Sequence, residues 1–213
     1  MGHKYRCLVV DDHPLMRKGV KDLLLAKGLC HAVVEAASAE AALTAVRRES
    51  WDLLVLDVAL PDKHGIEVLK EVKLLRPSLP VIMLSLYPER EFALRAIKAG
   101  ASGYLTKDRP PSELVKAVEE VAAGRRYITP SLANQMADLL DRGQPETLHA
   151  RLSDREMQVL RLLGQGKAVS IIADELALSV KTVSTYRGRL LEKLKLATTA
   201  DLIKYAIEHH LTT

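Results

Sequence analysis

The chain has 213 residues, of which 48% are hydrophobic and 27% are charged. This is enough for two globular domains, one of about 120 residues and a second, smaller one. No apolar run approaches the roughly 18 residues of a membrane span, the start of the chain lacks a signal-peptide pattern, and the net charge of +4 is too small to indicate a nucleic-acid partner by itself.

Residues 1–123 alternate short apolar runs with amphipathic stretches. Five runs are continuously apolar, as in parallel strands covered on both faces: Tyr5–Val10, Ala32–Glu35, Leu53–Leu56, Val81–Leu86 and Gly103–Leu105. Helical patterns follow each run: Pro14–Lys27, Ala39–Arg48, Gly65–Leu75, Glu89–Ala99 and Ser112–Ala123. Five such units predict an α/β fold, a doubly wound five-stranded parallel sheet with helices on both faces.

Two cysteines, Cys7 and Cys30, lie on predicted strands or at their edges. Their spacing is not that of metal ligands. We therefore predict reduced core thiols in a cytoplasmic protein.

Residues 124–149 are predicted to connect two domains. The segment 124–130 interrupts the preceding helical pattern, because it contains Gly124 and Pro130. Residues 131–142 favour a short helix, and residues 143–147 are typical of a flexible link.

Residues 150–213 are predicted to be entirely helical. Ser153 and Glu156 form a capping box that begins a helix ending near Leu163. Three more helices are expected: Ser170–Leu176, Val180–Leu194 with Ser179 as its cap, and a last one capped by Thr199 and ending near His209. A short turn at Ala177–Ser179 makes the second and third a helix-turn-helix.

Polar side chains follow the predicted strands where each one ends. Asp11 and Asp12 follow the first strand and Asp57 ends the third, whereas Ser85 lies near the end of the fourth and Lys107 follows the fifth. Parallel strands bring their carboxyl ends together at one edge of the sheet. Clustered carboxylates need a cation, and Mg²⁺ prefers such oxygen ligands. A bound cation makes one carboxylate a tolerable nucleophile toward a phosphoryl donor, and a lysine pairs with the added phosphate oxygens.

These residues resemble a known family. Residues 4–123 are similar to the flavodoxin/CheY-like receiver domain of bacterial response regulators. The resemblance rests on Asp11-Asp12, Asp57-Val-Ala-Leu-Pro61 with Gly65, Ser85, and Lys107 after Gly103-Tyr-Leu-Thr106.

The resemblance implies a role for each of these positions. Asp57 is implied to be the phosphoacceptor, with a histidine kinase as the phosphoryl donor. Mg²⁺ is implied to bind Asp12, Asp57 and the carbonyl oxygen of Ala59, with Asp11 contributing through water. Ser85, where the family often has threonine, and Lys107 are implied to bind the phosphoryl group, and Tyr104 matches an aromatic switch position.

The third helix of the second domain carries a basic face. Residues 181–195 hold five basic residues, Lys181, Arg187, Arg189, Lys193 and Lys195, against one acid. On charge alone, a solvated helix face is the favoured explanation. The apolar stripe Val183, Leu190 and Leu194, with Tyr186 beside it, leaves a second face free for a DNA groove. That face offers Lys181 and Thr182 for phosphates and Ser184, Thr185, Arg187, Gly188, Arg189 and Lys193 as further DNA-contact candidates.

Residues 150–210 resemble the LuxR-type helix-turn-helix of the NarL/FixJ response regulators. The similar positions include Leu152-Ser-Asp-Arg-Glu156, Gly166, Ile172-Ala173 and Leu178-Ser-Val-Lys-Thr-Val183. The sequence departs from the family at Ala168–Ile171, where a polar run is usual, and at Tyr186, where histidine is common. The resemblance implies a transcription factor that binds a two-fold promoter site as a homodimer, with RNA polymerase as a further candidate partner.

Three other functions compete with this interpretation. A phosphohydrolase of the haloacid-dehalogenase type also uses a strand-end aspartate, but it needs a second acid two residues later, where this chain has Ala59. A pure protein-interaction adaptor and a phosphorylation-independent regulator are the other two. We expect no enzyme activity beyond the domain's own phosphorylation and dephosphorylation.

Overall fold

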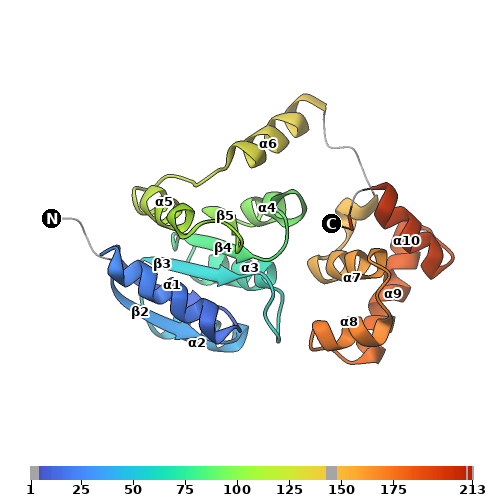
Figure 1. Ribbon diagram of the computed structural model, residues 1–213, viewed down its shortest axis with the longest axis horizontal. Helices are drawn as coiled ribbons and strands as arrows, with labels where there is room; N and C mark the ends of the chain where they lie inside the picture. The colour runs from blue at the N-terminus through green and yellow to red at the C-terminus, as the bar shows by residue number, and fades with distance from the viewer. Residues whose placement is uncertain (1–4, 143–147, 210, 213) are drawn as a thin grey trace. The chain divides into compact units, whose positions relative to one another are not determined.

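The computed structural model describes residues 5–142, 148–209 and 211–212, without the side chains of residues 90, 91, 138–142 and 150. The chain divides into two compact units, Met1–Ala137 and Asp138–Thr213 (Figure 1). The predicted link at residues 143–147 lies outside the described residues. Among the described helices, none is long and apolar enough to cross a bilayer.

The first unit contains one parallel sheet of five strands in the order β2-β1-β3-β4-β5. Its order reverses between β1 and β3, so the loops after these two strands face each other. The predicted doubly wound sheet is confirmed. The strands are β1 (Tyr5–Val10), β2 (Cys30–Ala36), β3 (Leu53–Asp57), β4 (Val81–Ser85) and β5 (Gly103–Thr106).

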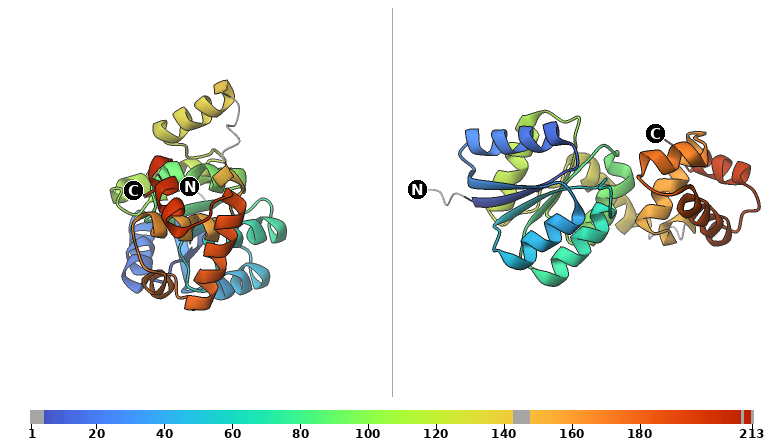
Figure 2. Two further views of the ribbon diagram at one scale, coloured as in Figure 1. Left: turned by 90° about the vertical axis from the view of Figure 1, so that its right-hand side faces the viewer. Right: turned by 90° about the horizontal axis from the view of Figure 1, so that it is seen from below.

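Helices cover both faces of this sheet (Figure 2). On one face, apolar residues of α1 and α5 share a core with β1, β3, β4 and β5, including Leu24, Val55 and Val118. The other face is covered by α2, α3 and α4, which pack in sequence order. Their bounds are α1 (Pro14–Ala26), α2 (Ala39–Arg48), α3 (Gly65–Leu75), α4 (Glu89–Lys98) and α5 (Pro111–Ala122).

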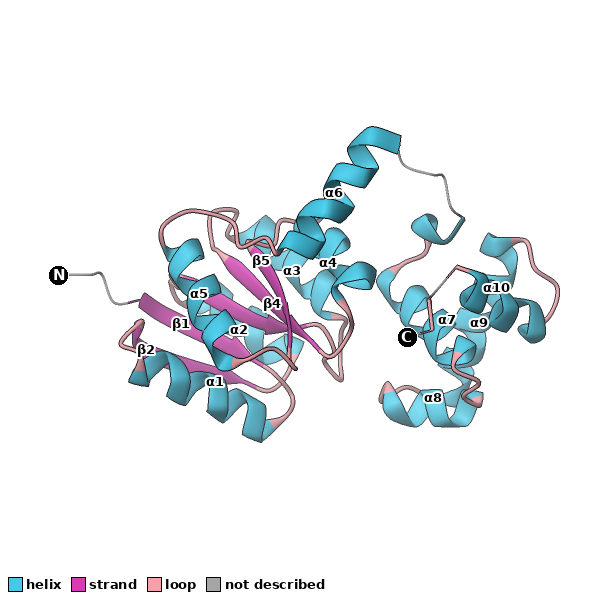
Figure 3. Cartoon of the chain, turned by 45° about the horizontal axis from the view of Figure 1, so that its top comes forward, coloured by secondary structure: helices cyan, strands magenta, loops and turns pink. Residues whose placement is uncertain are grey.

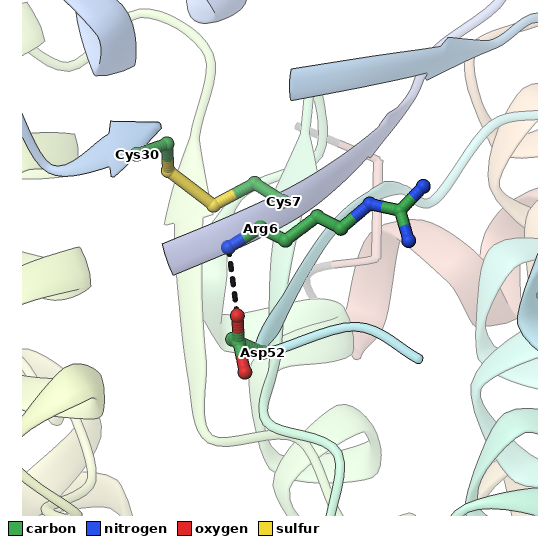
Figure 4. The surroundings of a disulfide bond; sticks show 4 residues. All are labelled: Arg6, Cys7, Cys30 and Asp52. Carbon is green, nitrogen blue, oxygen red and sulfur yellow. Dashed lines mark hydrogen bonds between the residues drawn. A yellow bond between two sulfur atoms is a disulfide. The ribbon is translucent and has the colours of Figure 1, made fainter. Parts of the chain in front are cut away.

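The prediction of two reduced thiols is wrong, because Cys7 and Cys30 are joined in a disulfide (Figure 4). Their Cα atoms lie 6.4 Å apart on the adjacent parallel strands β1 and β2. This separation is within the range that a disulfide requires. Spacing along the chain does not reveal this pair, because strand pairing brings together residues that are 23 positions apart.

The segment after α5 packs on the first unit. Tyr127 forms a parallel bridge with Gly103 at the outer edge of β5, and its amide donates to the carbonyl oxygen of Ser102 at 2.8 Å. Helix α6 (Pro130–Arg142) follows, close to the predicted bounds. The first part of the predicted connector is therefore attached to the receiver-like unit.

The second unit consists of helices. A short 3₁₀ turn, Leu148–Arg151, precedes α7 (Asp154–Gly164), α8 (Val169–Glu175), α9 (Val180–Leu194) and α10 (Thr199–Glu208). The capping box of Ser153 and Glu156 is confirmed. The cap of α10 is Thr198 rather than the predicted Thr199, because Thr198 is the residue that exchanges hydrogen bonds with Asp201 three positions on.

Candidate functional site

Three carboxylates meet at the carboxyl ends of β1 and β3. Asp57 ends β3 and is 1% exposed, and Asp11 follows β1 and is 2% exposed. Ligand atoms of Asp11, Asp12, His13 and Asp57 all lie within 4.8 Å of one another. The sheet topology thus brings together the acids that the sequence analysis selected.

Lys107 joins two of these acids. Its ammonium lies 2.6 Å from Asp57 Oδ2 and 2.7 Å from Asp11 Oδ2, and its side chain is only 3% exposed. Burial opposes a charge on Lys107, but Asp57 and Asp11 outweigh it and raise the pKa of the ammonium. The lysine is therefore a fixed positive charge beside Asp57.

The acidity of Asp57 is weakened by its surroundings. Burial raises its pKa from 3.8 to about 6, with Lys107 acting in the opposite direction and the charge of Asp11 adding to the rise. At neutral pH the carboxyl is mostly ionised and poorly solvated. The negative charge of such a carboxylate is stabilised by a bound cation or removed by reaction with a phosphoryl group.

The backbone around Asp57 is tightly packed. Gly65, the first residue of α3, donates its amide to the carbonyl oxygen of Val58 at 2.7 Å. A Cβ on Gly65 would overlap the carbonyl oxygen of Asp57 and lie 2.7 Å from the Cα of Val58. The amide of Ala59 donates to Asp57 Oδ1 at 3.1 Å, which fixes the carboxylate.

The donor set of this cluster fits Mg²⁺. The cation prefers several carboxylate oxygens and retained waters, and Asp12 keeps a partly exposed side chain, at 33%. His13 lies against the cluster: its amide donates to Asp11 Oδ1 at 2.8 Å and its ring lies 2.7 Å from Asp12 Oδ1. We place Asp11, Asp12 and Asp57 as the residues that would hold the ion.

Ser85 and Tyr104 are both fully buried, at 0% exposure. The hydroxyl oxygen of Ser85 accepts from the amide of Tyr87 at 2.9 Å, and the hydroxyl of Tyr104 donates to the carbonyl oxygen of Tyr87 at 3.0 Å. The backbone of Tyr87 therefore connects the two. Sequence reasoning missed Tyr87, because it acts through main-chain atoms that every residue has.

The predicted DNA-contact residues lie on α9 of the second unit. Val183, Leu190 and Leu194 are buried, which confirms the apolar stripe. Ser179 accepts from the amide of Thr182 at 3.0 Å and caps the helix. The other predicted residues are exposed (Lys181, Thr185, Gly188 and Arg189) or half-buried (Thr182, Ser184 and Arg187).

Lys193, also selected as a DNA contact, is ion-paired within its own unit. Its ammonium donates to Glu156 Oε2 at 2.7 Å, and Glu156 is 2% exposed. Burial raises the pKa of Glu156, but Lys193 and the capping interactions with Ser153 outweigh it, so the pKa is lowered. Lys193 therefore holds α9 against the start of α7.

Comparison with known proteins gives two family matches. Residues 7–119 match the response regulator receiver domain, and residues 150–206 match the bacterial regulatory proteins of the luxR family. Response regulator GacA of Pseudomonas viridiflava is 36% identical over 207 residues, covering 96% of both chains. Response regulator UvrY of Escherichia coli K12 is 35% identical over 206 residues, covering 96% of this chain and 94% of that one.

Among solved structures, RcsB of Salmonella enterica serovar Typhimurium bound to promoter P1flhDC with the phosphomimetic BeF3⁻ is 26% identical. It has a TM-score of 0.64 and covers 95% of this chain and 98% of that chain.

Proposed function

Because the chain belongs to the two-component response regulators with a luxR-type DNA-binding domain, we propose that phosphoryl transfer to Asp57 controls its binding to promoter DNA. The observation that carries the proposal is the buried carboxylate of Asp57, with Lys107 2.6 Å away and Asp11 and Asp12 beside it. A histidine kinase is the proposed phosphoryl donor.

In the proposed transfer, an oxygen of the Asp57 carboxylate attacks the phosphorus of a phosphohistidine. The new O–P bond forms as the P–N bond breaks, and the leaving imidazole takes up a proton from solvent. Mg²⁺, which Asp11, Asp12 and Asp57 would hold, would reduce the charge repulsion between the oxygens that approach each other. Lys107, which balances Asp57 and Asp11 in the resting protein, pairs with a phosphoryl oxygen afterwards.

The intact acidic set supports a regulated protein over a phosphorylation-independent one. The chain lacks the second acid that a haloacid-dehalogenase-type hydrolase needs, since Ala59 stands there. We therefore propose that its only catalysis is its own phosphorylation and dephosphorylation.

Helix α9 is the proposed DNA-contacting element. Its exposed face carries Lys181, Thr185 and Arg189, and the half-buried Arg187 lies on the same helix. A helix of this kind enters the major groove with its first turns near the bases. The solved structure of RcsB is bound to promoter P1flhDC, which supports promoter binding by this chain.

One such helix contacts few base pairs, so a single copy discriminates poorly against a genome of competing sites. We propose a homodimer on a two-fold site, with half-sites about one helical turn apart. An exposed apolar residue, Ile207 on α10, supports this, because it lies outside the core of its own unit at 54% exposure. RNA polymerase is a further proposed partner.

The phosphorylation proposal is tested by incubating the full chain with Mg²⁺ and a small phosphodonor and mapping the adduct. Wild type should be modified at Asp57 alone, chelation of Mg²⁺ should abolish labelling, and Asp57→Ala should not be labelled. Labelling of Asp57→Ala at the wild-type rate would show that another residue is the acceptor.

The DNA proposal is tested by mobility shift across salt concentrations. Lys181→Ala should weaken binding to all sequences and lower the salt slope by about one unit, whereas Arg187→Ala should change base preference. Lys204→Ala is the control, because it removes an exposed lysine from α10. Unchanged affinity and salt dependence in both α9 variants would mean that another surface contacts the DNA, whereas no binding by wild type would leave an adaptor role. Sedimentation with and without phosphodonor tests whether dimerisation depends on phosphorylation.

A further inference from the structure

The start of helix α6 is attached to the start of helix α4 by a buried hydrogen bond. The hydroxyl of Thr129 donates to Glu89 Oε2 at 2.8 Å, and the two residues are 6% and 7% exposed. We infer that this Glu89–Thr129 contact transmits the state of Asp57 to α6, and through α6 to the connection with the DNA-binding domain. The inference rests on the proposed function.

Thr129 serves α6 and the receiver at once. Its hydroxyl oxygen accepts from the amide of Leu132 at 3.1 Å, as an N-cap residue does, while the same hydroxyl donates to Glu89. Leu132, one turn into the helix, is fully buried. The beginning of α6 is therefore attached to the first unit through the Thr129–Glu89 hydrogen bond, close to the buried Leu132. Figures 1 and 3 show α6 following the segment after α5.

The segment that leads to Thr129 is held at the sheet edge. Tyr127 pairs with Gly103 of β5, and its hydroxyl donates to Glu113 of α5. A Cβ on Gly103 would lie 3.2 Å from the Cβ of Tyr127, so the two backbones approach closely. Movement of the chain at residues 128–132 therefore depends on the Glu89–Thr129 contact more than on the pairing behind it.

Glu89 is close to the switch residues along the chain. It begins α4 directly after Pro88, and the amide and carbonyl of Tyr87 bind Ser85 and Tyr104. A phosphoryl group on Asp57 has three acceptor oxygens that attract the Ser85 hydroxyl. Because Ser85 accepts from the amide of Tyr87, its movement pulls the loop of residues 86–88 toward Asp57 and draws Glu89 away from Thr129.

Space for this movement exists beside the contact. A groove of about 510 Å³ is lined by residues that include Leu86, Pro88, Glu89, Arg109 and Ser131. Arg109 is the nearest described cation to Glu89, at 3.9 Å from Oε1, and its side chain is 47% exposed. When Glu89 leaves Thr129, this arginine can pair with it in the groove, so the carboxylate does not become an isolated buried charge.

The test uses hydrogen exchange of the full chain, resting and treated with Mg²⁺ and a small phosphodonor. In resting Glu89→Ala, which keeps the hydroxyl cap of Thr129, exchange of the amide of Leu132 should be roughly ten-fold faster, as expected for loss of a hydrogen bond to a charged group. Exchange of the Tyr127 amide, which is held by Ser102 at the sheet edge, should not change. Thr129→Val should behave similarly, and Thr129→Ser, which keeps the donor, should match wild type. In wild type, phosphodonor should accelerate exchange by the same factor. In Glu89→Ala, phosphodonor should add little further acceleration.

Intact mass shows whether each sample carries a phosphoryl group. The Glu89→Ala substitution should not change the extent of phosphorylation. A phosphorylated wild type with unchanged exchange at Leu132 would overturn the inference while leaving the proposed function intact. Absence of phosphorylation in wild type would refute the proposed function, and resting Glu89→Ala would still test the contact. Equal DNA response to phosphodonor in Glu89→Ala and wild type would also overturn it.

Discussion

Replacing Asp57 with asparagine should stabilise the receiver domain when divalent cations are absent. The carboxyl is 1% exposed, and burial raises its pKa from 3.8 to about 6. In the unfolded chain the group ionises at its ordinary pKa. The folded state therefore holds a proton more strongly, and the stability contributed by the protonated group is lost as the pH rises through about 6.

The size of the effect follows from this difference. A rise from 3.8 to about 6 corresponds to a cost of about 3 kcal/mol for the ionised carboxylate above pH 7. Asparagine stays neutral but loses the charged partner at 2.6 Å, and Lys107 then keeps only Asp11. We expect a gain of about 1 to 3 kcal/mol in unfolding free energy at pH 8, and roughly 2 kcal/mol less gain at pH 4.5.

The assay is urea unfolding of the full chain in EDTA, followed by tryptophan fluorescence. Trp51 is the single tryptophan and is 9% exposed in the first unit, so it reports the receiver alone. Asp62→Asn is the control of opposite sign: burial raises the pKa of Asp62, but bonds from the amides of Ala39 and Glu40 outweigh it and lower the pKa. A neutral or destabilising Asp57→Asn at pH 8, or a gain independent of pH, would refute the reasoning.

Three further changes test other parts of the structure. Gly65→Ala should cost about 2 kcal/mol or more and slow phosphorylation, because its Cβ would overlap the Asp57 backbone; Gly19→Ala, with nothing within 4 Å of its Cβ, should do neither, and equal effects would contradict the packing argument. Reduction with dithiothreitol should lower the unfolding free energy of the receiver by roughly 3 kcal/mol, since the disulfide closes a loop across a 23-residue separation. Identical unfolding curves with and without dithiothreitol would count against that bond. Lys193→Met should destabilise the second unit by about 0.5 to 1 kcal/mol with the salt slope of DNA binding unchanged, since this partly exposed lysine is paired with Glu156; a slope lowered by one unit would instead make it a phosphate contact.

Strand and helix positions could largely be predicted, because they depend on local pattern. The continuous apolar runs marked β1 and β3, and Ser153 with Glu156 marked the start of α7. The cap of α10 was misassigned although the same rule applied: Thr198 has an acid three residues later, whereas the third residue after Thr199 is Leu202. That error came from an incomplete use of the pattern.

Other features depend on contacts between distant segments and leave no local pattern. The disulfide of Cys7 and Cys30 follows from the pairing of β1 and β2, and the bridge between Tyr127 and Gly103 follows from where the chain runs after α5. The ion pair of Lys193 with Glu156 has the same origin, so the basic face of α9 alone could not predict it. Each of these pairs is 23 or more residues apart.

The acidic site and the proposed connection from it to α6 therefore differ in how the sequence determines them. Asp11, Asp57 and Lys107 occupy strand ends, so sheet topology alone brings them together, and residue type indicates their chemistry. The proposed connection depends on the backbone of Tyr87 and on the hydroxyl of Thr129. A tyrosine in a loop and a threonine at a helix cap are both ordinary, so residue type does not indicate their role. A response regulator with the same strand-end residues but no donor at the cap of α6 would accept a phosphoryl group equally well. Its connection to the DNA-binding domain would then respond by another route, so the acidic residues alone do not determine the proposed effect of phosphorylation on DNA binding.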